Sequence, residues 1–411
     1  MYIYHKGGKI YVVSNSPLDT SGEELKVWCL GYSQEDILQK FVVKDGRLAK
    51  KDRKINPREA KIAFVGVWDI PCGIATYSKF LVDEMKNINP RVRVFAEEYE
   101  GAEDSDELIH CWRRGQSPRK LIKEIRKYNP DIVFIQHEYG IFPDARKWTQ
   151  LISALEDYKT YVTLHSVYDH KDKAVCEAIC KNLIVHSGAA KEVLTEKGIS
   201  SNIAVIPHGC VEFEETDRLW NIYRSPHTII QFGFGFEYKG WEIALDAVKL
   251  LKEKYSDVFY LMLFSESGFV KEQHELQYDR IRDLIEELDL EDNVAIVRGF
   301  QTDEAINHFL RTARVAVFPY TAAPGHVVYG STGAARIAMG NHTPTVVSKV
   351  PLFYDLKGVV PRAGNAEELA EEISRLFDDW KHYARVVEQE KRFVHENNWK
   401  ATARRYLGIK G

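Results

Sequence analysis

Short apolar runs alternate with amphipathic segments over most of the chain. Between Lys61 and His208, six of these runs predict buried strands: KIAFVGV, VRVFA, DIVFIQH, YVTLH, NLIVHS and AVIPH. Helices are predicted between them, at 75–85, 118–128, 144–158, 171–180 and 188–197. Strands that alternate with helices are typical of a parallel sheet with helices on both faces.

The same alternation restarts after an irregular, charged stretch that ends at Pro226. The predicted strands are TIIQFG, FYLMLFS, VAIVRG, VAVFPY and TPTVVS, and the predicted helices are 241–254, 272–289, 302–312 and 331–340. We therefore expect an α/β protein with two Rossmann-like doubly wound domains, 56–210 and 211–396. Ligands of such domains bind at the carboxyl ends of the strands, so we expect a cleft between the two domains.

Both ends of the chain depart from this pattern. Residues 1–55 contain two hairpin signals, Gly7-Gly8 and Asp45-Gly46, and a further strand candidate, KVWCLGY, which together predict a small antiparallel module of about four strands. This module would either bind an acceptor or a partner, or only cover the edge of a sheet. The segment 383–407 has apolar residues at helical spacing, with a break expected at Asn397-Asn398.

Composition narrows the classes of function. The net charge of −4 and the pI near 6.4 give no sign of binding to nucleic acid or to an anionic membrane. The six cysteines show no zinc-ligand spacing, and reduced thiols are the simplest interpretation. No apolar run approaches 18 residues and the first residues do not resemble a signal peptide, so we expect a cytoplasmic protein without a membrane span.

The stretch Val315–Ser348 predicts a strand, a loop of small residues, a helix and a second strand. Ser331, Thr332 and Gly333 open the helix, where free N–H groups and the positive end of the helix dipole favour an anion. Small residues at this point let a diphosphate approach the backbone. The alternative is that Ser, Thr and Gly are only good residues for a helix start.

Polar residues also follow several predicted strands. His137 and Glu138 follow DIVFIQ, His165 follows YVTL, and Lys239 comes after TIIQFG. They join Gly73, His208 and Ser331, which occupy the same kind of position, so we expect all of them at one edge of each sheet. Each histidine taken alone has an alternative interpretation as a hydrogen-bonded core residue.

Several motifs together resemble one family. PCGIATY, QHEYGIF, TLHS, IVHSGAAKEVL, VIPHG, FGFGFEYKG and the stretch after Pro319 are similar to retaining glycosyltransferases of family 4, in a bacterial branch with PCGIATY and QHEYGIF. The resemblance covers roughly residues 60–400 and leaves out the first 55. It implies the GT-B fold, in which the last helix, here 397–411, returns to the N-terminal domain.

The resemblance also implies roles for residues that match the motifs. Catalytic roles fall on His165, beside the donor sugar, and on Lys239, which pairs with the diphosphate. The donor-binding positions are Gly73, Gly233, Lys239, Arg298, Gly299, Phe300, Ser331, Thr332 and Gly333. No metal or cofactor is expected, because a lysine and a helix N-terminus supply the positive charge that the leaving diphosphate needs.

Two departures from the family pattern stand out. Phe234–Phe236 occupy the place of a basic residue, for which Arg298 or Arg336 could substitute. The usual pair of glutamates is absent, because its positions fall near Tyr329 and Ile337.

The resulting expectation is a retaining hexosyltransferase that uses GDP-mannose or UDP-glucose and a glycan, a lipid-linked or another hydroxyl acceptor. Two alternatives stay open. One is a catalytically silent GT-B protein that binds a glycan or a partner, and the other is a glycosyltransferase that acts on modified DNA bases.

Overall fold

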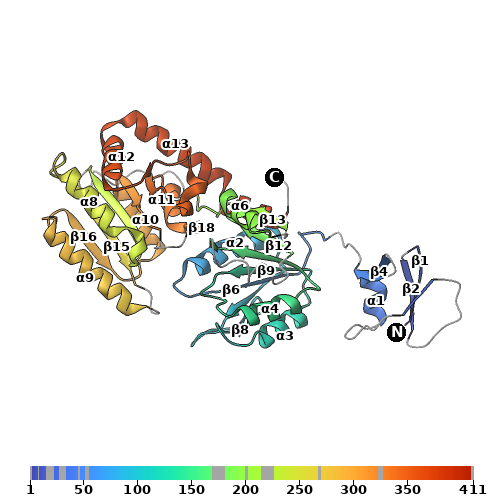
Figure 1. Cartoon of the computed structure of the whole chain (residues 1–411). Coiled ribbons are helices and arrows are strands. Elements are labelled where there is room, and N and C mark those ends of the chain that lie inside the picture. Colours follow the sequence, from blue (N-terminus) through green and yellow to red (C-terminus); the bar gives the residue numbers. More distant parts are fainter. Residues whose placement is uncertain are drawn as a thin grey trace. The chain divides into compact units, whose positions relative to one another are not determined.

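The computed structural model describes residues 2–7, 9–14, 23–26, 34–44, 47–50, 55–168, 181–199, 202–213, 226–266, 270–322 and 327–408. The chain divides into two compact units, Met1–Asn56 and Pro57–Gly411 (Figure 1). The predicted helix at 171–180, the turn Asp45-Gly46 and most of the irregular stretch that ends at Pro226 lie outside the described residues.

The first unit is a small β-rich module, as predicted. A sheet with the order β2-β1-β3 and a separate hairpin β4–β5 are both antiparallel. The strands are β1 (Tyr2–Lys6), β2 (Lys9–Ser14), β3 (Glu23–Lys26), β4 (Phe41–Lys44) and β5 (Arg47–Lys50). A helix, α1 (Gln34–Lys40), was not predicted, because its sequence QEDILQK is too short and too polar to show a helical period.

The second unit begins with a parallel sheet, here called the first sheet, whose strand order is β13-β12-β10-β9-β6-β7-β8. Its strands are β6 (Ile62–Gly66), β7 (Val92–Glu97), β8 (Leu108–Trp112), β9 (Ile132–His137), β10 (Lys159–Leu164), β12 (Asn182–Val185) and β13 (Asn202–Val205). Its helices are α2 (Gly73–Ile88), α3 (Arg119–Tyr128), α4 (Ala145–Ala154) and α6 (Gly188–Glu196). Only β8 was not predicted, because LIHCW follows an acidic stretch and places a histidine inside a short apolar run. The first sheet and its helices form the first lobe.

The second lobe repeats this plan around a second parallel sheet with the order β16-β15-β14-β17-β19-β20. Its strands are β14 (Thr228–Phe234), β15 (Phe259–Ser265), β16 (Val294–Arg298), β17 (Val315–Phe318), β19 (Thr345–Ser348) and β20 (Arg362–Ala363). Its helical segments are η1 (Glu237–Lys239), α8 (Trp241–Lys252), α9 (Lys271–Glu287), α10 (Asp303–Thr312), α11 (Gly333–Gly340), η2 (Pro351–Leu356), α12 (Ala366–Asp378) and α13 (Trp380–Glu396). Strands β17 and β19 are buried along their whole length, as apolar strands covered on both faces should be. The prediction of two doubly wound halves is therefore confirmed.

The last helix, α14 (Trp399–Tyr406), packs on α2 of the first lobe. The predicted break is present, since Asn397 ends α13 and the side chain of Asn398 caps α14. The Trp399 ring lies 4.9 Å from the ring of Tyr77 and 5.5 Å from that of Phe80. The last helix therefore returns to the first lobe, as the family resemblance implies.

Candidate active site

Lys239 stands at the carboxyl edge of the second sheet, in the connection between β14 and α8. Its Nζ donates a hydrogen bond of 2.9 Å to the hydroxyl of Tyr320 and lies 4.1 Å from the centre of that ring. The next residue, Gly240, has a φ of +68°, and a Cβ there would meet the carbonyl oxygen of Pro319 at 1.9 Å. Glycine is therefore required for this close turn, which fixes Lys239 beside the end of β17. Burial lowers the pKa of the Lys239 ammonium.

Gly233 and Lys239, both predicted to bind the donor, come together. A Cβ on Gly233 would lie 3.7 Å from Cε and 3.8 Å from Nζ of the lysine. The backbone of Gly233 has a φ of +147°, which side-chain-bearing residues rarely adopt.

A buried ion pair holds the Ser331–Gly333 loop at the start of α11. The Arg336 guanidinium pairs with Asp355 of η2 and donates a hydrogen bond of 2.8 Å to the carbonyl oxygen of Thr332. The hydroxyl of Ser331 donates to the same carboxylate at 3.3 Å. Thr332 also lies next to the Tyr320 hydroxyl, so the loop and Lys239 share one neighbour. The N-terminus of α11 has no side-chain cap, which leaves its N–H groups for another acceptor.

A short antiparallel ladder brings His165 of the first lobe to this loop. β11 (Ser166–Tyr168) pairs with β18 (Val328–Gly330), with Ser166 opposite Gly330. A Cβ on Gly330 would lie 2.7 Å from the carbonyl oxygen of His165, so glycine permits this approach. The ladder therefore joins the segment after β10 to the residue that precedes Ser331.

Three histidines surround Tyr77 at the carboxyl edge of the first sheet. The rings of His165, His186 and His208 have their centres 4.7, 5.4 and 4.8 Å from that of Tyr77. A Cβ on Gly333 would lie 3.7 Å from the His208 ring, so this cluster also meets the start of α11. The prediction that polar residues from different strands gather at this edge is confirmed for His165 and His208, whereas His186, which follows β12, was not predicted.

The imidazoles of this cluster are neutral at pH 7. Burial lowers the pKa of His186 to about 4 and holds the pKa values of His165 and His208 well below their usual range. Nε2 of His165 donates a hydrogen bond of 2.9 Å to the side-chain oxygen of Gln136, and Nδ1 of His186 donates to the carbonyl oxygen of Ile206. His137, next to Gln136, is buried by aromatic rings, and this burial lowers its pKa to about 3.

The remaining predicted residues occupy the same sheet edges at greater separation. Gly73 is the first residue of α2, and a Cβ there would meet open space. Arg298 ends β16, which lies two strands away from β14, and Gly299 and Phe300 follow it. Arg298 is held by Glu266 and Glu275, and Arg336 is buried against Asp355, so both arginines proposed as substitutes already have a carboxylate partner.

Sequence reasoning missed Tyr320 and Asp355. Tyr320 ends the predicted strand VAVFPY, and its place at a strand end was a usable signal. Asp355 follows Ser331 by 24 residues and lies in a short 3₁₀ segment, so no spacing rule links the two.

Two family models match the chain, and together they cover most of the second unit. Residues 71–211 match Glycosyltransferase Family 4, and residues 212–393 match Glycosyl transferases group 1. The chain therefore belongs to the glycosyltransferases with the GT-B fold. No curated protein matches the sequence.

Solved structures show the same fold. A glycosyltransferase of Rickettsia africae has 17% identity, covers 86% of this chain and 98% of its own, and has a TM-score of 0.69. Sucrose-phosphate synthase of Thermosynechococcus elongatus has 19% identity over 84% and 96%, with a TM-score of 0.66. HepE of Anabaena in complex with UDP has 14% identity over 85% and 98%, also with a TM-score of 0.66.

Within the described ranges, no helix is both long and apolar enough to cross a membrane.

Proposed function

We propose that this chain is a retaining glycosyltransferase that moves a hexose from a nucleotide sugar to a hydroxyl acceptor. One observation carries the proposal: the β11–β18 ladder holds His165 against Gly330, immediately before the Ser331–Gly333 loop at the start of α11. A neutral imidazole from one lobe and a helix N-terminus from the other thus face the same small region. HepE, which has the same fold, was solved with UDP bound and also with UDP and glucose, which supports a nucleotide-sugar donor.

Each residue has a proposed role that follows from its surroundings. Lys239 and the free N–H groups at the start of α11 would bind the diphosphate, since both favour negative charge. Gly233 and Gly73 would leave room for that group, because neither carries a side chain. Arg298, Gly299 and Phe300 would lie beside the base of the nucleotide, and the exposed ring of Phe300 offers an apolar surface for it.

In the proposed reaction the acceptor hydroxyl attacks the anomeric carbon from the face that the diphosphate leaves. The bond between the acceptor oxygen and the anomeric carbon forms while the bond from that carbon to the phosphate oxygen breaks, and the leaving phosphate oxygen takes the acceptor's proton. His165 would contact the donor sugar as a neutral hydrogen-bonding group, because its lowered pKa keeps it unprotonated. Positive charge from Lys239 would stabilise the diphosphate as it leaves.

GDP-mannose and UDP-glucose are the proposed donors. A thermal-shift panel of UDP, GDP, ADP and the corresponding sugars tests this most simply. A nucleotide at 100 times its dissociation constant should stabilise the fold by about 2.7 kcal/mol. We also propose that the reaction needs no metal, and turnover should then be the same with and without EDTA.

A silent glycan- or partner-binding protein is the second candidate, and the absence of both family glutamates favours it. Release of nucleoside diphosphate from the donor separates the two, because only an active enzyme releases it. We also propose that the protein is cytoplasmic and that residues 1–55 bind an acceptor or a partner.

A further inference from the structure

Gln136 is a fully buried amide near the end of β9, the central strand of the first sheet. Its register partner on β10 is Thr163, whose hydroxyl is hydrogen-bonded to that of Tyr406 on α14. A Cβ on Gly66 would lie 3.4 Å from Cγ of Gln136 and 3.3 Å from Oγ of Ser78 on α2. Because paired residues of parallel strands share a face, Gln136 lies on the face of the sheet that α2 and α14 cover.

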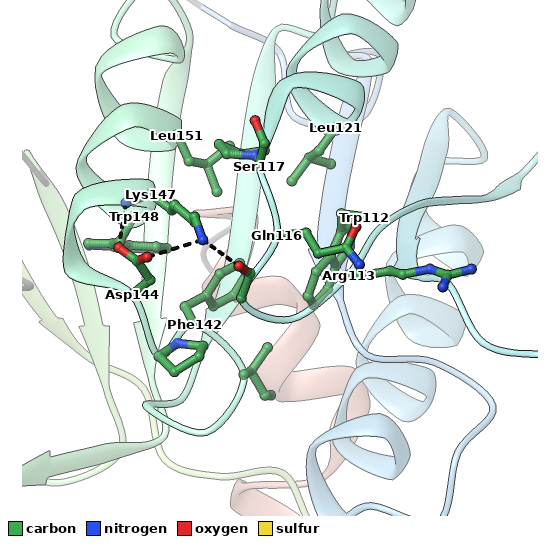
Figure 2. Close-up of a pocket in the computed structure, with 14 residues that line it drawn as sticks. Trp112, Arg113, Gln116, Ser117, Leu121, Phe142, Asp144, Lys147, Trp148 and Leu151 are labelled. Carbon is green, nitrogen blue, oxygen red and sulfur yellow. Dashed lines mark hydrogen bonds and ion pairs between the residues drawn. The ribbon is translucent and has the colours of Figure 1, made fainter.

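The next residue, His137, lies on the opposite face of the sheet, because side chains alternate along a strand. Its ring packs 4.6 Å from that of Trp148 and 5.8 Å from that of Phe142, two of the aromatic side chains that Figure 2 shows. The carbonyl oxygen of His137 accepts the backbone N–H of His165 at 3.2 Å. Aromatic packing on one face thus fixes the end of β9, which in turn holds the main chain of His165.

The side chain of Gln136 holds the imidazole of the same histidine. Nε2 of His165 donates a hydrogen bond of 2.9 Å to Oε1 of Gln136. With its proton on Nε2, the neutral ring carries a lone pair on Nδ1, which can then only accept a hydrogen bond. Nδ1 has no partner among the described residues and, unlike Nε2 of His186, is not sealed from solvent. The half-buried ring therefore presents an acceptor to the candidate active site.

An uncharged partner suits this arrangement. A neutral imidazole has two tautomers, and the hydrogen bond made by one nitrogen decides which of them is populated. A carboxylate in place of the amide would raise the pKa of His165 and favour the imidazolium, which donates from both nitrogens. Gln136 selects the tautomer without adding that charge. The rings of Tyr77 and His186, with centres 4.7 and 5.2 Å from that of His165, restrict its rotation.

We propose that Gln136 is a positioning residue that holds His165 as the Nε2–H tautomer, so that Nδ1 accepts a hydrogen bond from a hydroxyl group of the donor sugar. The inference rests on the proposed function, because it assigns the residue that orients His165 for the transfer. Gln136 acts only through His165 and does not itself touch the donor.

The first test reads the imidazole directly and needs no donor. The full chain is labelled with ¹⁵N-histidine, and ¹H–¹⁵N correlation spectra are recorded at pH 7 for the unchanged protein, Gln136→Met and Gln277→Met. His165→Ala identifies the signals of His165 by their absence. Gln277 is the matched control, because it is a buried glutamine of the second lobe that donates to Glu242.

The proposal predicts a protonated Nε2 and an unprotonated Nδ1 for His165 in the unchanged protein and in Gln277→Met. In Gln136→Met the Nε2 proton loses its acceptor, so its signal should disappear through exchange with solvent and both tautomers should be populated. A proton on Nδ1 in the unchanged protein, or an unaltered Nε2 signal in Gln136→Met, would overturn the proposal.

The second test is a double-mutant cycle in turnover of UDP-glucose and GDP-mannose. Gln136→Met should lower kcat by about fivefold, the loss expected for His165→Ala, and leave KM for the donor within about twofold. In the His165→Ala background the same substitution should change kcat by less than about 1.5-fold, because its effect passes through that imidazole. Equal losses in both backgrounds would show that Gln136 only supports the fold. Absence of turnover in the unchanged protein counts instead against the proposed function, and the spectra then decide whether Gln136 fixes His165.

Discussion

The two lobes present different chemistry to the region where they meet. The first lobe presents neutral imidazoles packed on an aromatic ring, since burial depresses the pKa values of His165, His186 and His208. The second lobe presents a lysine, a helix N-terminus and a buried arginine. We propose from this difference that the neutral histidines of the first lobe contact the sugar, and that the positive groups of the second lobe bind the diphosphate.

The largest effect should come from breaking the ion pair between Arg336 and Asp355 in the second lobe. Asp355→Ala leaves the buried Arg336 cation without its carboxylate, which should cost about 3–5 kcal/mol of unfolding free energy. It should also release Ser331, which loses its acceptor, so donor turnover should fall. Urea unfolding and donor turnover measure the two effects.

The double variant Arg336→Met/Asp355→Leu separates stability from positioning. Replacing both charges with apolar side chains should restore most of the unfolding free energy without restoring turnover. Full turnover in the double variant would show that the pair only supports the fold.

The neutral state of the buried histidines in the first lobe can be tested by measuring the free energy of unfolding at decreasing pH. Unfolded histidine takes up a proton below a pH of about 6.5, whereas folded His137 stays neutral down to a pH of about 3. Stability is therefore lost as the pH falls through this window, by roughly 1 kcal/mol per pH unit for this residue. His137→Phe should flatten the decline by that amount when urea unfolding is followed from pH 7 to pH 4. An unchanged slope would mean that His137 is not held neutral.

Lys239→Ala tests whether the positive charge of the second lobe binds the donor diphosphate. Loss of the ammonium should lower kcat/KM for the donor by at least about tenfold, equivalent to about 1.4 kcal/mol. Lys271 is the matched control, because it is an exposed lysine at a helix start. If Lys239→Ala and Lys271→Ala behave alike in donor kinetics, the Lys239 ammonium does not bind the donor.

His165→Ala should have the smallest effect of the four single substitutions. We expect kcat to fall by about fivefold, or about 1 kcal/mol, with little change in Tm. His110→Ala is the control, since His110 is a buried histidine of the same lobe that pairs with Asp104. A His165 variant that keeps full turnover, or one that unfolds, would remove the functional role.

The architecture of the second unit could be predicted because its central strands are continuous apolar runs. β6, β9, β17 and β19 are covered on both faces, so their sequences carry little besides buried residues. The three-residue strands β11 and β18 have no such signature, and they pair only because the lobes meet there. The ladder that joins His165 to the Ser331–Gly333 loop could therefore not be predicted from the sequence.

The contacts of the candidate active site could likewise be predicted from the sequence only where they are local. Gly233 and Lys239 come together across a local strand–loop–helix connection, which a motif can describe. The contacts of Lys239 with Tyr320 and of Ser331 with Asp355 join segments brought together by folding. The division into 1–55, 56–210 and 211–396 stays a prediction beyond the boundary near residue 56.

Proton NMR of the sugar product tests most directly whether the protein transfers a hexose from a nucleotide sugar with retention of configuration. The protein is incubated with UDP-glucose or GDP-mannose and a methyl glycoside acceptor, and the configuration of the new anomeric proton is recorded as it forms. Retaining transfer should release the nucleoside diphosphate and give an α-linked product from the α-linked donor. A β-linked product would contradict retention, and neither binding nor turnover of any nucleotide sugar would contradict the proposed activity itself.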